Sequence, residues 1–281
     1  IHKVTVGIAG KHIRSLQHSD YIMRDNPDQY ITEDDIEKLK DQVKKLVMLP
    51  GEEIIHVLPQ EYKVDSEGEI QEPIGMHGKR LEANFHVVVG QMGSIRNIAR
   101  CVREAGLEME SLTLEPLASS ESVLTKEEKE AGVAIVDIGG GSTEIAVISL
   151  GGMVANKSIR IAGDDFTADI MEYMNRQHNI KVGERTAEQI KINVGSALTD
   201  LGDEAPEDYI VRGPNRMTSL PMEVPVSYME IAHCLEKSIT KIEAAVLAAL
   251  ESTPPEIYAD LVKNGIYLAG GGALLRGLAK R

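Results

Sequence analysis

The sequence predicts an α/β fold built around two glycine-rich turns. Two apolar runs flank the first turn, 133–138 before it and 143–148 after it, and their β-branched residues favour strands. A further strand-like run at 265–269 leads into the glycines at 270–272, and helical sequence fills much of the interval between the two turns. Strands that alternate with helices in this way are typical of α/β proteins.

The composition indicates a globular protein that can bury a substantial core. With 281 residues and 42% hydrophobic side chains, the chain is long enough for one large domain or for two to three smaller ones. No apolar run approaches the ~18 residues of a membrane span, and charges close behind Ile1 argue against a secretory leader. Because the chain opens on a strand and without methionine, we expect it to be an excerpt of something longer.

Charge and cysteine content argue against several classes of partner and site. No basic stripe offsets the formal net charge of −14, which argues against a nucleic-acid partner. Two phenylalanines and no tryptophan also argue against recognition of stacked bases. Cys101 and Cys234 are isolated, so their spacing indicates neither a metal centre nor a redox pair and suits a reducing compartment.

The first third of the chain contains clear helix signals. Thr32 is a good N-cap, because acidic residues fill the first turn that follows it. Gly106 is placed to end a helix. The expected elements are, in order, a strand at 3–9, a polar loop, a charged helix at 32–47, strands near 53–58 and 84–90, and a helix at 93–105.

The remainder is expected to be a connector followed by a more apolar α/β region. Residues 109–132 form the connector, with a short helix and a charged stretch at 126–130 that we interpret as a solvated face. Met217 and Met222 lie beside prolines in a segment that we expect to be irregular and to serve packing. Further helices are expected near 164–178, 184–199, 227–251 and 255–263, the last with prolines at its start.

The residues of the first glycine turn suit an anion site. Glycines allow backbone N–H groups to approach an anion closely, and the hydroxyls of Ser142 and Thr143 add donors. Asp137, at the end of a buried strand, is placed to hold a magnesium ion through water, or else to cap the turn. Taken singly, each glycine cluster is equally compatible with a purely structural turn.

Taken together and in this order, the two clusters resemble the phosphate and adenosine loops of the actin, Hsp70 and sugar-kinase ATPases. Residues 133–281 closely resemble MreB, the bacterial actin that guides cell-wall synthesis. The resemblance implies an actin/Hsp70-like ATPase fold, of which this part is the second lobe, with an insert-like subdomain at about 180–240. It is carried by the runs at 136–148, 163–166, 183–191, 253–256 and 269–277.

Residues 1–132 instead resemble FtsA, the actin homologue that attaches the division ring to the membrane. This resemblance implies an FtsA 1C-like (SHS2-type) subdomain at 1–108 and a return into the first ATPase lobe at 109–132. The combination departs from both families, so the chain is either a natural or constructed hybrid or a divergent FtsA. The runs that carry the resemblance lie at 6–13, 56–62, 73–78 and 117–124.

The resemblance also implies roles for individual residues. Glu115 matches the glutamate that orients the attacking water, although FtsA-like proteins often turn over weakly. Glu188 and Lys191 lie three residues apart on one helix face and would meet the ribose and adenine, or form only a surface ion pair. The other implied ligands of ATP and Mg²⁺ are the phosphate wrap Gly139, Gly140, Gly141, Ser142 and Thr143, the magnesium carboxylate Asp137, the phosphate-side turn Gly163 and Asp164, and the adenosine floor Gly270, Gly271, Gly272, Ala273 and Leu274.

The implied function is that of an ATP-binding cytoskeletal protein. We expect self-association into filaments on the inner face of the cell membrane, in division or in cell-shape control. Partners would include FtsZ if the protein acts like FtsA, and cell-wall elongation proteins if it acts like MreB. The alternatives are an ATP-binding membrane-tethering scaffold with little turnover, and a small-molecule kinase or heat-shock-type ATPase of the same superfamily. If the protein hydrolyses ATP, we expect a weak activity that is coupled to filament dynamics.

Overall fold

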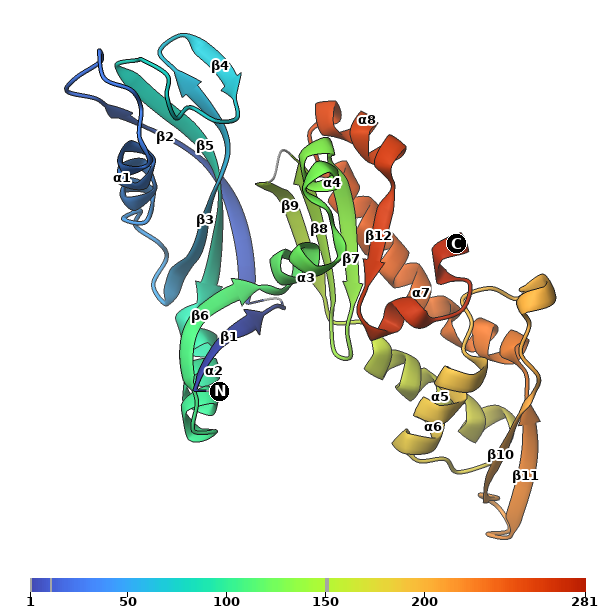
Figure 1. Cartoon of the computed structure of the whole chain (residues 1–281). Coiled ribbons are helices and arrows are strands. Elements are labelled where there is room, and N and C mark those ends of the chain that lie inside the picture. The colour runs from blue at the N-terminus through green and yellow to red at the C-terminus, as the bar shows by residue number, and fades with distance from the viewer. Residues whose placement is uncertain (1, 11, 150–151) are drawn as a thin grey trace. The chain divides into compact units, whose positions relative to one another are not determined.

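The computed structural model describes residues 2–10, 12–149 and 152–281, so Lys11 of the FtsA-like run lies outside the described part (Figure 1). The chain forms two compact units. The first contains residues 1–135, 146–157 and 249–267, and the second contains residues 136–145, 158–248 and 268–281. Each unit is therefore assembled from segments that are distant in the sequence.

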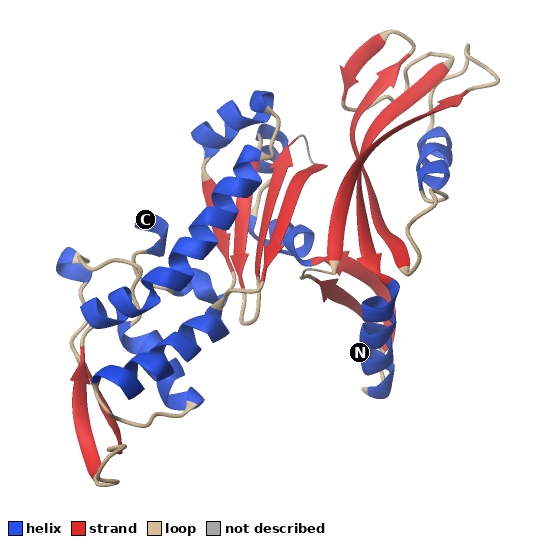
Figure 2. Cartoon of the chain, turned by 180° about the vertical axis from the view of Figure 1, so that it is seen from behind, coloured by secondary structure: helices blue, strands red, loops and turns tan. Residues whose placement is uncertain are grey.

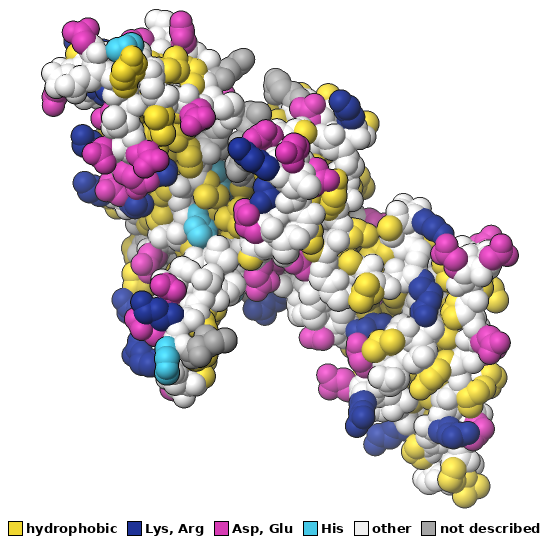
Figure 3. All heavy atoms as spheres, in the orientation of Figure 1, with side chains coloured by type: hydrophobic (Ala, Val, Ile, Leu, Met, Phe, Trp, Pro, Cys, Tyr) yellow, Lys and Arg dark blue, Asp and Glu magenta, His cyan; other side chains and the backbone are white. Residues whose placement is uncertain are grey.

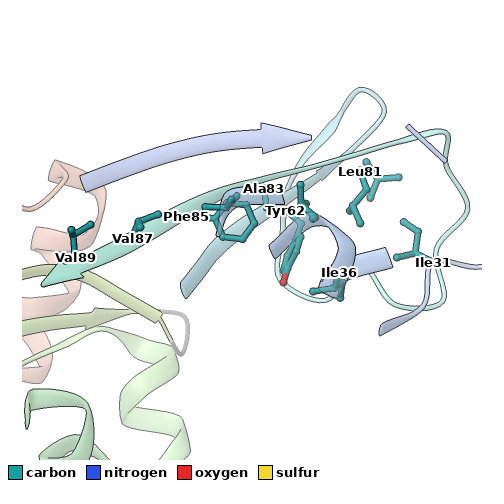
Figure 4. Close-up of a cluster of buried hydrophobic side chains, with 11 residues drawn as sticks. Ile31, Ile36, Tyr62, Leu81, Ala83, Phe85, Val87 and Val89 are labelled. Carbon is teal, nitrogen blue, oxygen red and sulfur yellow. The ribbon is translucent and has the colours of Figure 1, made fainter. Parts of the chain in front are cut away.

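A four-stranded antiparallel sheet with one helix dominates the N-terminal part of the first unit. Its strand order is β2-β5-β3-β4, and α1 (Glu33–Val43) packs against it through Ile36, Leu39 and Val43. Every second residue of β5 is buried from Leu81 to Val89, and these side chains line one face of the strand in Figure 4. The strands are β2 (Ile13–Met23), β3 (Glu52–Val64), β4 (Glu67–Ile70) and β5 (Arg80–Gln91).

Several boundaries in this part differ from the predicted ones. The prediction of a polar loop before α1 is wrong, because this segment contains β2, which pairs with β5 from Ile13 to Met23. β2 lies at the edge of the sheet and carries polar residues on both faces. His18 and Asp20 lie on its less exposed side, whereas Tyr21 and Met23 are exposed, so no apolar–polar alternation marks it as a strand. The helix expected to reach residue 47 ends at Val43, where two successive turns closed by i→i+3 hydrogen bonds replace the helical pattern.

The buried guanidinium of Arg24 organises the loop that leads into α1. Its side chain is only 6% exposed and pairs with Asp35 in the first turn of the helix, with Nε 3.1 Å from Oδ2. The remaining N–H groups donate to three backbone carbonyls, those of Gly78, Gln29 and Tyr30. A single side chain thus satisfies backbone acceptors from two separate stretches, 29–30 and 78, and pairs with a helix carboxylate as well.

A two-stranded parallel pair and three helices complete the N-terminal half. β1 (Lys3–Ile8) pairs with β6 (Glu108–Leu114), so the connector expected at 109–132 opens with a strand that was not predicted. Gly106 adopts a φ of +77° just beyond α2, as expected of a residue that ends a helix. The helices are α2 (Met92–Glu104), α3 (Glu115–Val123) and α4 (Lys126–Ala131), the last of which carries the charged stretch.

A second four-stranded sheet has the strand order β12-β7-β8-β9, and each glycine turn follows one of its strands, β7 or β12. β7 (Val133–Ile138) and β8 (Thr143–Ser149) are neighbours joined by residues 139–142, which confirms the predicted hairpin. β9 (Gly152–Ile159) and β12 (Ile266–Ala269) complete the sheet. Leu250 at the end of α7 (Tyr228–Glu251) and Leu261 of α8 (Pro255–Asn264) pack against it, on the helix-covered face seen in Figure 2.

The second unit adds two helices and a β-ribbon. α5 (Gly163–Gln177) follows the prediction closely, whereas α6 (Glu184–Val194) ends before residue 199, because Ser196 instead bridges to Arg276. The prediction of an irregular segment around Met217 and Met222 is wrong, since β10 (Tyr209–Pro214) and β11 (Pro221–Val226) pair antiparallel there. Met217 is 83% exposed in the turn between them, where Figure 3 shows hydrophobic side chains at the free end of the ribbon.

Glu230 ties the start of α7 to the end of α5. Its Oε2 accepts hydrogen bonds from the backbone N–H and hydroxyl of Ser227, and its Oε1 accepts from Tyr173 and lies 3.0 Å from His178 Nε2. Burial raises the pKa of this carboxyl, but the hydrogen bonds from Ser227 and His178 outweigh burial, so its pKa lies below the ordinary value. Glu230 is therefore charged at neutral pH, as an N-terminal capping carboxylate should be.

We expect Glu230→Ala to destabilise the protein by about 1–2 kcal/mol at pH 7, because a helix cap and its hydrogen bonds are lost. A carboxyl whose pKa is lowered by folding stabilises above its unfolded pKa, near 4.5, and this stabilisation disappears as the pH falls through its folded pKa. The deficit should therefore shrink at pH 3, as measured by urea unfolding at both pH values. Glu223→Ala, which removes an exposed partner of Arg212 on the ribbon, is the control. An equal deficit for Glu230→Ala at both pH values would contradict this account.

No helix in the described part of the chain is both long enough and apolar enough to cross a membrane.

Candidate functional site

A cavity of about 490 Å³ lies within the second unit, where the two glycine turns and two helices meet. Its volume is within the usual range for small-molecule sites. Nine of the residues singled out in the sequence line it, and Phe166, Ile192 and Leu275 complete the lining. The nine are Gly139, Gly140, Gly163, Asp164, Glu188, Lys191, Gly271, Gly272 and Leu274.

Backbone hydrogen bonds join the first glycine turn to the start of α5. Gly139 N–H donates to Ser142 O at 3.0 Å and closes the turn. Gly163 N–H and Asp164 N–H donate to the carbonyls of Gly139 and Gly140, at 3.1 and 2.8 Å. The phosphate turn and the phosphate-side turn expected from the sequence thus form one hydrogen-bonded wall of the cavity.

The second glycine turn lies directly against the end of β7. A Cβ atom at Gly270, whose φ is +81°, would overlap Oδ1 of Asp137 and the carbonyl oxygen of Ile138. A Cβ atom at Gly272 would overlap the side chain of Ile138. Glycine is therefore required at both positions, because the backbone there lies too close to the end of β7 to leave room for a side chain. By contrast, no neighbouring atom lies within 4 Å of the place that a Cβ would take at Gly271, which lines the cavity.

Glu188 and Lys191 of α6 form an ion pair at the cavity wall, with Nζ 2.6 Å from Oε2. Lys191 also donates to Gly163 O at 2.9 Å, so the pair is tied to the start of α5. Burial raises the pKa of the Glu188 carboxyl, but hydrogen bonds from Lys191 and Thr167 outweigh burial, and the pKa lies below its ordinary value. The cavity therefore presents a carboxylate, not a carboxylic acid, at neutral pH.

The comparison with known proteins identifies this architecture. Residues 90–281, more than half of the chain, match the family model described as MreB/Mbl protein, and residues 10–89 match that of the SHS2 domain inserted in FtsA. The chain belongs to the MreB/Mbl family. Its fold is the actin-like ATPase fold with an FtsA-type SHS2 domain, as the sequence predicted.

Individual relatives cover both parts of this MreB/Mbl family chain. The cell division protein FtsA of Pseudomonas aeruginosa is 37% identical over 278 residues, covering 99% of this chain and 63% of the relative. The crystal structure of MreB 5 of Spiroplasma citri bound to AMPPNP has a TM-score of 0.60 at 34% identity, covering 68% of this chain and 55% of that one. The PilM–PilN pilus biogenesis complex shares the fold over 99% of this chain and 65% of that one, with a TM-score of 0.56 at 16% identity.

The chain spans less than two thirds of the length of the FtsA relatives that it matches. Alignment with FtsA nevertheless continues through the part that matches the MreB/Mbl model. The combination that departs from both family patterns is thus matched along its length by natural relatives.

The other predicted site residues do not belong to the cavity lining. Asp137 lies beside the second glycine turn but is not part of the cavity lining. Gly270, which belongs to that turn, does not line the cavity either. Thr143 is fully buried and donates its hydroxyl to Ile161 O at 2.7 Å. Gly141, Ser142 and Ala273 flank the lining residues without belonging to them.

Glu115, the residue expected to orient water, belongs to the first unit. It is the first residue of α3, and its side chain lies beside Gly7, where a Cβ atom would be 3.0 Å from its Cγ. The cavity lies wholly in the second unit, so the role of Glu115 stays a prediction.

Sequence reasoning did not select three lining residues, Phe166, Ile192 and Leu275. Each lies within two residues of a predicted one, so the apolar neighbours of Asp164, Lys191 and Leu274 were the available signal. These side chains suit the flat apolar part of a ligand better than its charged part.

Proposed function

We propose that this protein binds ATP in the cavity of the second unit and acts as an actin-like cytoskeletal protein. The observation that carries the proposal is that both glycine turns and the Glu188–Lys191 pair line the same cavity. Glycines at 139, 140 and 163 allow backbone to approach phosphate oxygens, whereas the apolar side chains suit a base. A relative at 34% identity is bound to AMPPNP, an ATP analogue, which supports the same ligand class here.

We also propose Asp137 as the residue that holds magnesium. Its carboxylate lies at the junction of the two glycine turns, and Mg²⁺ in nucleotide sites usually keeps several waters and takes one or two carboxylates together with phosphate oxygens. No cluster of three or more metal-ligating side chains occurs among the described residues. A magnesium ion held by a single carboxylate, waters and phosphate oxygens needs no such cluster. When bound, the ion would neutralise phosphate charge.

Domain roles follow from the same proposal. Residues 133–281 would form the second ATPase lobe, with an insert-like part at about 180–240, residues 109–132 would return into the first lobe, and residues 1–108 would form the FtsA-type subdomain. The family models that match 10–89 and 90–281 support an FtsA-type part followed by an MreB-like part. The match to FtsA across the whole chain favours a divergent FtsA over a constructed hybrid.

At the level of the cell, we propose self-association into filaments at the inner face of the membrane. The relatives are named for cell division and cell-shape determination, which supports one of these two roles. FtsZ is the proposed partner in a division role, and cell-wall elongation proteins are the proposed partners in a shape role.

Nucleotide titration of the full-length protein tests the proposal directly. Calorimetry with ATP and Mg²⁺ should detect saturable binding, and sedimentation should show assembly that depends on nucleotide. Failure to bind ATP or ADP would refute the proposed ligand. Binding without assembly would leave a nucleotide-dependent membrane scaffold in place of a filament former.

Glu115→Ala distinguishes an ATPase from a scaffold. If Glu115 orients the attacking water, the variant should keep its ATP affinity and lose on the order of 100-fold in hydrolysis rate. The measurement is phosphate release under conditions in which wild-type filaments are present. Glu121→Ala in the same helix α3, which removes an exposed partner of Lys129, is the matched control and should leave the rate unchanged. Unchanged hydrolysis in Glu115→Ala would assign Glu115 a structural role beside Gly7.

A further inference from the structure

The helices α1 and α2 of the first unit differ in how their basic residues are paired. In and directly after α1, each of three lysines lies within ion-pair distance of an acidic residue three positions before it. Pairs at this spacing are an ordinary way for a helix to neutralise its basic side chains, so α1 carries no surplus of positive charge. The pairs are Lys38 with Asp35 at 3.8 Å, Lys40 with Glu37 at 2.8 Å and Lys44 with Asp41 at 2.8 Å.

The arginines of α2 lack this pattern of pairing. Arg96, Arg100 and Arg103 are spaced by four and three residues, so they lie on one face of the helix, and all three are exposed. Among the described residues, the one ion pair that they make joins Arg100 Nε to Glu104 Oε1 at 3.7 Å, between side chains that are 67% and 71% exposed. Because like charges at such spacing repel each other, α2 keeps a basic face at a cost to its own stability.

This basic face is opposite in sign to the charge of the whole chain. The sequence contains 44 acidic residues against 30 lysines and arginines, which gives a formal net charge of −14. Carboxylates are therefore abundant, yet three neighbouring arginines share one weak partner. A cluster of one sign on a protein of the other sign attracts ligands of complementary charge, so this face suits a polyanionic surface.

The opposite side of α2 is held against the protein. Ile95, Ile98 and Val102 lie there and are half-buried. A Cβ atom at Gly90 of β5 would be 3.1 Å from Cδ1 of Ile95, which shows how closely the helix approaches the sheet. These apolar side chains are committed to packing. The helix can thus present charge to a partner, but it cannot insert an apolar face into hydrocarbon in the manner of an interfacial amphipathic helix.

The side chains around the arginines favour lipid headgroups over a protein partner. The nearest exposed side chains are those of Asn97 and Glu104, and no exposed aliphatic or aromatic side chain of α2 accompanies them. Protein interfaces depend on buried apolar or aromatic anchors at their centre. Guanidinium groups, in contrast, pair with phosphate oxygens through two hydrogen bonds, and basic residues adsorb to anionic headgroups through charge alone.

We propose that the arginine face of α2, formed by Arg96, Arg100 and Arg103, contacts the anionic phospholipid headgroups of the membrane. The inference rests on the proposed location at the inner face of the membrane and adds the surface and the lipid class. Three arginines without an inserted apolar group form an auxiliary contact that orients the protein on the bilayer. The contact is sensitive to salt, because exposed charges are screened beyond about 8 Å at physiological ionic strength.

The test is sedimentation of the full-length protein with vesicles that contain phosphatidylglycerol, with pure phosphatidylcholine vesicles as the neutral reference. Each arginine near an anionic surface contributes about fivefold in affinity, equivalent to about 1 kcal/mol. The triple variant Arg96→Gln, Arg100→Gln and Arg103→Gln should therefore lose on the order of 100-fold for the anionic vesicles and nothing for the neutral ones. The corresponding triple change to lysine keeps the charge and should retain most of the binding.

The matched control is the triple variant Lys38→Gln, Lys40→Gln and Lys44→Gln, which removes the same charge from lysines that already have acidic partners. It should bind anionic vesicles like the wild type. Equal losses in both triple variants, or no loss in the arginine variant, would overturn the assignment to α2.

Two further measurements separate this inference from the proposed function. Calorimetry with ATP should give the wild-type affinity in the arginine variant, because α2 contributes nothing to the cavity lining. A wild type that binds ATP but neither kind of vesicle would refute the membrane location and this inference with it, and would leave nucleotide binding intact. Loss of assembly by the arginine variant in the absence of vesicles would assign the face to a second copy of the chain and overturn the lipid assignment.

Discussion

Gly271→Leu is expected to abolish nucleotide binding without unfolding the protein. Gly271 lines the cavity, and no neighbouring atom lies within 4 Å of the place that a Cβ would take there. The larger side chain therefore meets no protein atom at its base and projects into the space that the ligand needs. We expect the affinity for ATP to fall by more than about 1,000-fold, equivalent to about 4 kcal/mol. Calorimetry measures the affinity, and thermal unfolding without nucleotide should give an unchanged midpoint.

The neighbouring glycine provides the contrast. Gly272→Leu forces a side chain into Ile138, and overpacking of this kind costs about 1–3 kcal/mol, so this variant should unfold more easily even without ligand. Gly93→Leu, at another open position but in α2, should change neither property. Normal ATP affinity in Gly271→Leu would remove the cavity from consideration as the nucleotide site.

Arg24→Met is expected to cost about 3–5 kcal/mol of stability, the largest effect outside the cavity. The substitution leaves the carboxylate of Asp35 poorly paired and deprives the carbonyls of Gly78, Gln29 and Tyr30 of their donors. Urea unfolding followed by circular dichroism measures the loss in the full-length chain.

The control for this prediction is an arginine at the start of β5. Arg80 is 46% exposed, pairs with Glu82 and covers the ring of Tyr21, so Arg80→Met should cost no more than about 1 kcal/mol. If both arginine variants lose the same stability, the buried network around Arg24 does not have the role assigned to it.

The elements that were predictable are those in which local sequence and tertiary packing agree. The hairpin at 133–148 combines β-branched runs with glycines, and α5 begins one residue before its expected start at 164. β2 was missed because polar residues occupy both of its faces, so its sequence shows no apolar–polar alternation. The β10–β11 ribbon was missed because prolines at 214, 221 and 225 argue against strands, although a two-stranded ribbon has free edges that tolerate them.

The candidate site was predictable for the same reason, but only in part. The glycines at 270 and 272 mark a close approach of backbone, and the contacts with Asp137 and Ile138 account for them. The hydrogen bonds of Thr167 with Glu188 and Lys191 could not be predicted, because they form where α5 packs on α6 and nothing in the sequence around Thr167 marks it. Sequence patterns report single elements, whereas a cluster shared by two helices depends on how they pack.

The order of strands in the second sheet has a consequence for how the protein acquires its ligand during synthesis. β12 pairs with β7, yet all of residues 139–265 separate them in the chain. Contacts of such long sequence separation form late, and translation adds only about 5–20 residues per second. A nascent chain therefore carries a completed phosphate turn for several seconds before the segment that forms the opposite wall has left the ribosome, and chaperones have that interval in which to engage an empty half-site.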